Sequence, residues 1–304
     1  MRRIVSRKMP DGNVRLVQPF HISMEGLEKE MLCRDEEDYD AFVKIICVSA
    51  KRKNVIVIIY AVVSNHCHVA VLASCQTDAD KYGNEIKRIY SMWFNKKYGK
   101  KNALKRVDVK AILLDSDWYV RNALAYIPRN ALDNGCDIAG YPWSGYRAMF
   151  TNEYQEKPEP RPVSLLTKED KRRIMHTGDR LDGVAWQIDG KNHLVPRSIC
   201  DFSYLEQVFE NDPAYFLKTI GGQNASEMRQ KLVDAPRKRL TDNEFLKIAE
   251  ETSERWFSCE IGQISQERKI RLIPYLYRTS KTTVPQLARI FGIGREQISR
   301  ILHL

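Results

Sequence analysis

Residues 55–72 read Val55-Ile-Val-Ile-Ile-Tyr-Ala-Val-Val63, then Ser64-Asn65, then His66-Cys-His-Val-Ala-Val-Leu72. The first nine residues are apolar and mostly β-branched, which is typical of a buried strand. The apolar run resumes after a two-residue interruption, so the stretch predicts a hairpin of two central strands. Its longest apolar segment is far too short to span a bilayer.

The segments around this hairpin alternate between strand and helix patterns. Apolar side chains at three- and four-residue spacing indicate amphipathic helices, whereas alternating or β-branched runs indicate strands. The expected elements are, in chain order, a strand at 19–25, a helix at 35–53, the hairpin, a helix at 78–98, a strand at 107–114 and a helix from 117 to about 132. This order predicts an α+β fold, with a ferredoxin-like (split βαβ) antiparallel sheet and its helices on one face.

The length of 304 residues favours two domains, or three. A stretch rich in proline and charge, Gln155–Pro162, predicts a linker. We therefore expect an N-terminal α+β domain over residues 1–152, a linker and mixed connecting region over 153–239, and an all-α region over 240–304. Within the connecting region, Gly221-Gly222 predicts a turn.

The composition indicates a basic, folded chain. There are 49 Lys and Arg residues against 39 Asp and Glu, which gives a net charge of +10 and predicts a polyanionic partner. An apolar fraction of 43% excludes a wholly disordered chain. Seven cysteines without paired spacing fit reduced thiols, and the basic N-terminus has no apolar segment behind it. We therefore expect a cytoplasmic, nucleoid-associated protein that binds nucleic acid and no membrane.

His66 and His68 give the first sign of chemistry. Because residues two apart on a strand face the same way, both imidazoles are expected on one side and Cys67 on the other. Two neutral imidazoles side by side form half of a divalent metal site. Two alternatives stay open at this point: histidines that merely lie near a sheet surface, and a zinc site, which no Cys-x-x-Cys pattern supports.

A second pair lies in the last predicted helix of the N-terminal domain. Tyr126 precedes Asn130 by four residues, so a helix stacks both on one face. The two pairs together resemble those of the HUH-type single-tyrosine transposases of insertion sequences, most closely the REP-associated tyrosine transposases. The resemblance rests on four stretches, which cover about half of the chain: Phe20-His-Ile-Ser with the acidic segment Arg34-Asp-Glu-Glu-Asp-Tyr39, Val63-Ser-Asn-His-Cys-His-Val69, Tyr126-Ile-x-x-Asn130, and Tyr141-Pro-Trp-Ser-Gly-Tyr146.

This resemblance implies a role for each residue of the two pairs. His66 and His68 would bind Mg²⁺ or Mn²⁺, Asn130 would be a third, polar ligand, and Tyr126 would be the nucleophile. The implied reaction cleaves single-stranded or hairpin-bearing DNA and leaves a 5′-phosphotyrosine on the enzyme and a free 3′-hydroxyl. The family includes both monomers and homodimers, so the resemblance leaves the oligomeric state open.

The chain departs from the family pattern inside the tyrosine motif. Family members typically read Tyr-Ile-x-x-Asn-Pro, whereas this chain has Pro128 within the motif and Ala131 after Asn130. Proline at position 128 has no N–H to donate to the carbonyl of Leu124. We therefore expect a kink that affects the position of Asn130 more than that of Tyr126.

A basic segment follows the histidine motif. Residues 87–110 hold nine basic residues and one acidic residue, interleaved with aromatic ones. Basic groups track a phosphate backbone, so we predict DNA contacts, whereas we expect the aromatic side chains to fill the core. The residues of this segment assigned to DNA binding are Lys87, Arg88, Lys96, Lys97, Lys100 and Lys101.

The C-terminal stretch Val284–Leu302 has the spacing of a helix-turn-helix. Ala288 would let two helices approach, Gly292 would make the turn, and Ile298 would anchor the second helix. The side chains then available to a DNA groove or a hairpin stem are Arg295, Gln297, Ser299 and Arg300. An ordinary helical hairpin is the alternative.

Three functions compete at this stage. The leading one is a metal-dependent, single-strand-specific DNA endonuclease and strand transferase, a tyrosine transposase with an appended DNA reader, acting in transposition or on hairpin-forming repeats. The second is a non-catalytic DNA-binding regulator on the same fold. The third is an HUH replication or conjugation initiator, against which the lack of a second tyrosine near Tyr126 and of a helicase motif argues.

Overall fold

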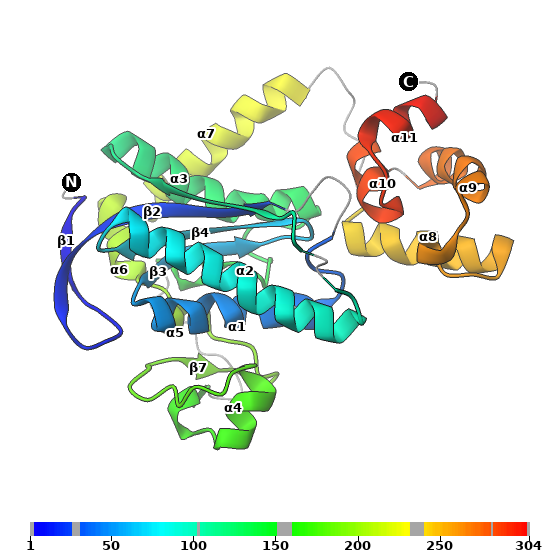
Figure 1. The fold of residues 1–304 in the computed structure, drawn as a ribbon. Helices are drawn as coiled ribbons and strands as arrows, with labels where there is room; N and C mark the ends of the chain where they lie inside the picture. The colour runs from blue at the N-terminus through cyan, green and yellow to red at the C-terminus, as the bar shows by residue number, and fades with distance from the viewer. Residues whose placement is uncertain are drawn as a thin grey trace.

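The computed structural model describes residues 3–25, 31–101, 104–150, 160–231, 240–280 and 282–302. Most of the predicted linker, residues 155–159, lies outside these ranges. The N-terminal half contains a curled antiparallel sheet with helices packed against it, so the mixed α and β class is confirmed (Figure 1).

The sheet has the spatial order β3-β4-β2-β5, and β1 extends it along the first residues of β2. The strands span Val5–Lys8 (β1), Val14–Glu25 (β2), Ile56–Val62 (β3), His66–Ala73 (β4) and Asp108–Leu113 (β5). Each of these pairings is antiparallel. The predicted hairpin is confirmed, because β3 pairs with β4 and the Val63 N–H donates to the His66 carbonyl at 2.9 Å. The ribbon made by β1 and the start of β2 was not predicted.

Helices α1 (Glu36–Lys53) and α2 (Gln76–Tyr98) cover one face of the sheet, and α3 (Asp117–Arg129) covers the other (Figure 1). Gly83 of α2 marks the first face, because a Cβ there would lie 2.7 Å from Val109 and 3.2 Å from Ile22. The prediction that the helices lie on one face is therefore wrong. Strand β3 is buried along almost its whole length, so its apolar side chains need cover on both faces.

The middle of the chain packs around the same hydrophobic core as the sheet. Its elements are β6 (Arg161–Pro162), α4 (Lys168–Ile174), β7 (Gln187–Ile188), α5 (Pro196–Ile199), α6 (Phe202–Val208) and α7 (Pro213–Lys231). Gly221 and Gly222 lie inside α7, so the turn predicted there is wrong. A glycine costs a helix about 1 kcal/mol, and the burial of Phe216 and Ile220 on α7 offsets that cost.

Among the described residues after 240, four α-helices share a core of their own. They are α8 (Asp242–Phe257), α9 (Gln266–Thr279), α10 (Val284–Phe291) and α11 (Arg295–Leu302), as expected for the C-terminal region. Met31 is buried in the same cluster, so the N-terminal half touches these helices. Within the described ranges, no helix is long and apolar enough to cross a membrane. The domain boundaries at 152 and 239 stay predictions.

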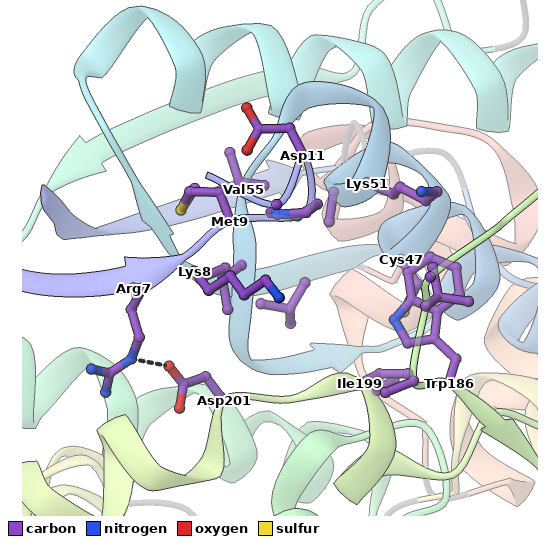
Figure 2. A pocket seen from close by; sticks show the side chains of 18 of the residues that line it. Arg7, Lys8, Met9, Asp11, Cys47, Lys51, Val55, Trp186, Ile199 and Asp201 are labelled. Carbon is purple, nitrogen blue, oxygen red and sulfur yellow. Dashed lines mark hydrogen bonds and ion pairs between the residues drawn. The ribbon is translucent and has the colours of Figure 1, made fainter. Parts of the chain in front are cut away.

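A cavity of about 790 Å³ opens between the β1–β2 turn, α1 and the start of β3 (Figure 2). Cys47, Val57 and Trp186 line it, together with an ion pair in which Arg7 Nε lies 2.8 Å from Asp201 Oδ2. Val57 lies at the end of the β3–β4 hairpin opposite to the turn, five residues along the strand from that turn. Since Val57 pairs with Val71, the cavity lies roughly 10 Å from His68 and 17 Å from His66 along the strand, and its lining includes none of the residues of the site described next.

Candidate active site

Strand β4 begins with His66 and presents it together with His68 on the face that α3 covers. The centroids of the two imidazole rings lie 5.0 Å apart. Cys67 lies between them in sequence but is fully buried on the other face, where desolvation raises the pKa of its thiol to about 12. The thiol is therefore directed away from any metal that the imidazoles would hold.

Helix α3 brings Tyr126 and Asn130 to these histidines. The Tyr126 ring lies edge-on to His68, with 5.2 Å between the ring centroids. The side-chain oxygen of Asn130, Oδ1, lies 3.1 Å from Nε2 of His66. Because residues four apart share one face of a helix, both side chains reach the same patch of the sheet. The structure thus brings together all four residues of the two pairs.

Pro128 does not separate Asn130 from the histidines. Helix α3 continues to Arg129 and then tightens into a 3₁₀ turn over Asn130–Asn134. The Nδ2 group of Asn130 donates to the carbonyls of Tyr126 at 3.0 Å and Ile127 at 3.1 Å. These two bonds anchor the fully buried amide and leave Oδ1 directed toward His66.

Two further residues complete the site, and sequence reasoning did not select either of them. Nδ1 of His66 lies 2.9 Å from Oδ1 of Asn65, and Nδ1 of His68 lies 3.0 Å from Nε2 of His21. His21 belongs to the Phe20-His-Ile-Ser stretch that contributed to the family resemblance. Its place beside His68 follows from the pairing of β2 with β4, which the hydrophobic pattern of one strand does not reveal.

Burial keeps two of these imidazoles neutral. Desolvation lowers the pKa of His21 to about 4. Desolvation is also the largest cause that lowers the pKa of His68 well below its usual value, with further contributions from His66 and His21. A neutral imidazole has a lone pair that can bind a metal ion, so His68 is in the ligand-competent charge state at pH 7.

Two imidazoles and one amide oxygen would be the protein ligands of a divalent metal ion bound at this site. This donor set consists of Nε2 of His66, Oδ1 of Asn130 and the second imidazole, His68. Three protein donors leave coordination positions for water and phosphate oxygen, as Mg²⁺ and Mn²⁺ require. Among the described residues, no group of three or more His, Cys, Asp or Glu side chains could hold a metal, so this mixed set depends on the Asn130 amide.

Four of the six cations predicted to contact DNA lie on α2, which covers the face of the sheet opposite to this site. Lys97 pairs with Asp35 at 2.7 Å and with Asp38 at 2.8 Å. Arg88 pairs with Glu85 at 2.8 Å. The charges of Lys97 and Arg88 are therefore balanced by acidic side chains of the protein. This weakens the prediction, made from the number of basic residues alone, that these two residues contact DNA.

The other four cations of this group differ in their surroundings. Lys87 donates to the backbone carbonyls of Lys105 at 3.3 Å and Val107 at 2.6 Å. The remaining three side chains are exposed, namely Lys96, Lys100 and Lys101. The aromatic residues among them behave as expected, since Tyr90 and Phe94 are buried in the core. DNA contact by this face stays a prediction.

Lys110 of β5, in contrast, lies on the same face as the histidines. It pairs across the sheet with Ser23, which pairs with His68 on the next strand. Residues directly opposite each other in an antiparallel sheet share a face, and two strand spacings amount to about 10 Å. The Lys110 side chain is 55% exposed and its Nζ lies 3.3 Å from Asp108. Lys110 therefore places a largely exposed cation, ion-paired with Asp108, on the histidine face of the sheet.

The C-terminal reader residues lie on α11. Gly292 ends α10 with a φ of 64°, a conformation that glycine adopts without strain. Ala288 and Ile298 are fully buried, as expected for two helices in close contact. Of the four predicted reader residues, Ser299 is half-buried. The other three are exposed, namely Arg295, Gln297 and Arg300.

Comparison with known proteins bears on the N-terminal half. Residues 20–108 match the family model described as "Transposase IS200 like". This segment is similar to the IS200-like transposases. The match contains His66 and His68 and ends before Tyr126. It confirms the resemblance that the sequence motifs gave, and it supports transposition-related processing of DNA as the class of function.

No curated protein matches the chain. A solved structure that does match is described as "Structure of the REP associates tyrosine transposase bound to a REP hairpin". It is 15% identical, and the match covers 42% of this chain and 76% of that chain with a TM-score of 0.34. This structural similarity is too low to support any conclusion beyond the match with the IS200-like transposases.

Proposed function

We propose that this protein is a metal-dependent endonuclease and strand transferase for single-stranded DNA, acting through a covalent bond between Tyr126 and a 5′-phosphate. One observation carries the proposal. Tyr126 lies edge-on to His68, with 5.2 Å between ring centroids, while Asn130 of the same helix contacts His66. A nucleophile and a set of metal donors thus lie on one face of the sheet.

The chemistry exchanges one phosphate ester for another. The phenolic oxygen of Tyr126 attacks the phosphorus, the bond from phosphorus to the 3′-oxygen breaks, and the phenolic proton passes to solvent while the 3′-oxygen gains one. An ordinary phenol has a pKa of ~10, so roughly one in a thousand is ionised at pH 7. This deficit corresponds to about 4 kcal/mol.

The residues around Tyr126 lower this barrier by position and charge. His66, His68 and Asn130 would hold Mg²⁺ or Mn²⁺, which when bound polarises the phosphoryl oxygen. The guanidinium carbon of Arg129 lies 5.8 Å from the centroid of the Tyr126 ring. Its positive charge favours the negative charge that develops during attack.

The proposal includes the finer features of the fold. The order β3-β4-β2-β5 with antiparallel neighbours supports a ferredoxin-like sheet. The sharp turn at Gly292 between α10 and α11 supports a helix-turn-helix. The partner we propose is hairpin-bearing single-stranded DNA, with the strand near Lys110 and Tyr126 and the folded stem at α11.

The decisive experiment is adduct formation. The protein is incubated with a pool of hairpin-bearing single strands and either Mn²⁺ or Mg²⁺, and adducts are resolved on a denaturing gel. We expect a DNA-linked protein band whose modified peptide contains Tyr126. If no strand in a broad pool is cleaved with either metal, the non-catalytic regulator becomes the better account.

The reader residues give a separable prediction. Replacing Arg295 by alanine is expected to weaken binding of the cognate hairpin about tenfold, because a specific base or phosphate contact is worth ~1–3 kcal/mol. Cleavage of an unstructured strand at saturating concentration should not change. Lys247→Ala on α8 is the matched control, since it removes one exposed positive charge from another helix of the same region. Equal loss in both variants would point to charge alone.

A further inference from the structure

His21 lies beside the metal-donor set without belonging to it. It is on β2, one diagonal step from His68, since Ser23 is directly opposite His68 and Ala70 is opposite His21. Its Nε2 lies 3.0 Å from Nδ1 of His68, and the two ring centroids lie 5.0 Å apart. This contact occupies Nδ1 of His68, so Nε2 is the ring nitrogen that remains for a metal ion.

His66 also has a hydrogen-bond partner at its Nδ1. Its Nδ1 lies 2.9 Å from Oδ1 of Asn65, an amide oxygen that can only accept. The amide oxygen of Asn130 lies 3.1 Å from Nε2 of His66, so two acceptors face the single proton of a neutral ring. A metal ion bound at Nε2 would leave that proton on Nδ1, where Asn65 accepts it. The bond at one ring nitrogen sets which nitrogen is free to bind a metal.

We propose that His21 is a positioning residue, which accepts a hydrogen bond from Nδ1–H of His68 and so leaves Nε2 of His68 free to bind the metal. Asn65 and His21 then act in parallel, one for each histidine of β4. This inference rests on the proposed function in one respect, namely that the site binds a metal. The tautomer of His68 is a property of the protein alone.

The opposite direction of the bond has an opposite consequence. If Nε2–H of His21 donated instead, Nδ1 of His68 would accept and the His68 proton would lie on Nε2. His68 could then bind no metal through that nitrogen without losing the proton first. The two directions are distinguished by locating the proton on His68.

The first test reads the tautomer directly. Nitrogen NMR of protein with ¹⁵N-labelled histidine distinguishes Nδ1–H from Nε2–H rings without any metal or DNA. We expect His68 as a single Nδ1–H form in the unchanged protein, retained in His21→Gln, whose side-chain oxygen can accept, and lost in His21→Leu. An Nε2–H form of His68 in the unchanged protein, or an unaltered spectrum in His21→Leu, would overturn the proposal.

The second test is Mn²⁺ binding by calorimetry in the absence of DNA. We expect His21→Leu to weaken binding 10- to 100-fold, as the loss of an outer hydrogen-bond partner does, and His21→Gln to restore most of it. His176→Leu is the matched control, because His176 is another largely buried histidine whose pKa is lowered by desolvation and it lies against Trp93 instead. Unchanged binding in His21→Leu would contradict the positioning role.

The two tests separate this inference from the proposed function. If the unchanged protein binds no Mn²⁺ and no Mg²⁺ while the NMR spectrum shows the His21-dependent tautomer, the metal-dependent mechanism fails and the hydrogen bond stands. If the protein binds Mn²⁺ but His68 keeps its tautomer without His21, the mechanism stands and the role of His21 is overturned.

Discussion

Tyr126→Phe is expected to reduce covalent protein–DNA adduct formation by on the order of 10³-fold or more, because it removes the phenolic oxygen that attacks phosphorus in the proposed mechanism. The substitution deletes one oxygen and keeps the ring that packs edge-on against His68. Binding of the same strand should therefore stay within about twofold. The measurement compares adduct yield on a denaturing gel with affinity for the uncleaved strand.

Tyr119→Phe serves as the control, since Tyr119 lies on the same helix and is also partly buried. It should form the adduct at the rate of the unchanged protein. An adduct that persists in Tyr126→Phe would move the nucleophile elsewhere, and the proposed mechanism would fail with it.

The parts of the site that depend on local periodicity were predictable. His66 and His68 share a face because a strand alternates, and Tyr126 and Asn130 share a face because a helix repeats after about four residues. What sequence did not reveal is how these elements meet. Whether α3 lies on the histidine face depends on the burial of β3 from both sides, which is a property of the assembled sheet.

The place of His21 beside His68 was even less predictable from the sequence. His21 is 45 residues away from His66 in the sequence, and only the register of β2 against β4 brings it to His68. A shift of that register by one residue would turn His21 to the other face. The hydrophobic pattern specifies that β2 is a strand, but the partner strand and its register come from packing.

The number of charges along the chain is a limited guide for a related reason. The run of cations on α2 predicted a DNA surface, yet Lys97 lies among acidic side chains at the start of α1, some sixty residues earlier. A count along the chain cannot identify partners that the fold supplies. Lys110 lies two strands from His68, and the same pairing of strands brings it near the site.

Asp242 links the C-terminal helices to the loop before the histidines. It is almost fully buried, and its carboxylate forms a two-pronged ion pair with Arg289 at 2.7 Å for both contacts. Gln286 of α10 donates to it at 3.1 Å. The hydroxyl of Ser64 donates to it at 2.5 Å, two residues before His66. One carboxylate therefore joins α8, α10 and the β3–β4 turn.

Asp242→Ala is expected to destabilise the C-terminal helices by about 3–5 kcal/mol, because the mutation leaves the largely buried Arg289 guanidinium and the Ser64 hydroxyl without their acceptor. The measurement is hydrogen exchange followed by mass spectrometry, in which peptides of α8 and α10 should lose protection. Thermal unfolding should shift in the same direction.

Ser64→Ala separates the two halves of this network, because it removes the link to the β3–β4 turn and leaves the ion pair with Arg289 intact. It should cost only ~1 kcal/mol and leave α8 and α10 protected from exchange. Exchange should instead rise in the turn that carries Asn65, whose side chain contacts His66. If Asp242→Ala and Ser64→Ala gave the same exchange pattern, the carboxylate would matter only to the turn, and the ion pair with Arg289 would add nothing to the packing of α8 on α10.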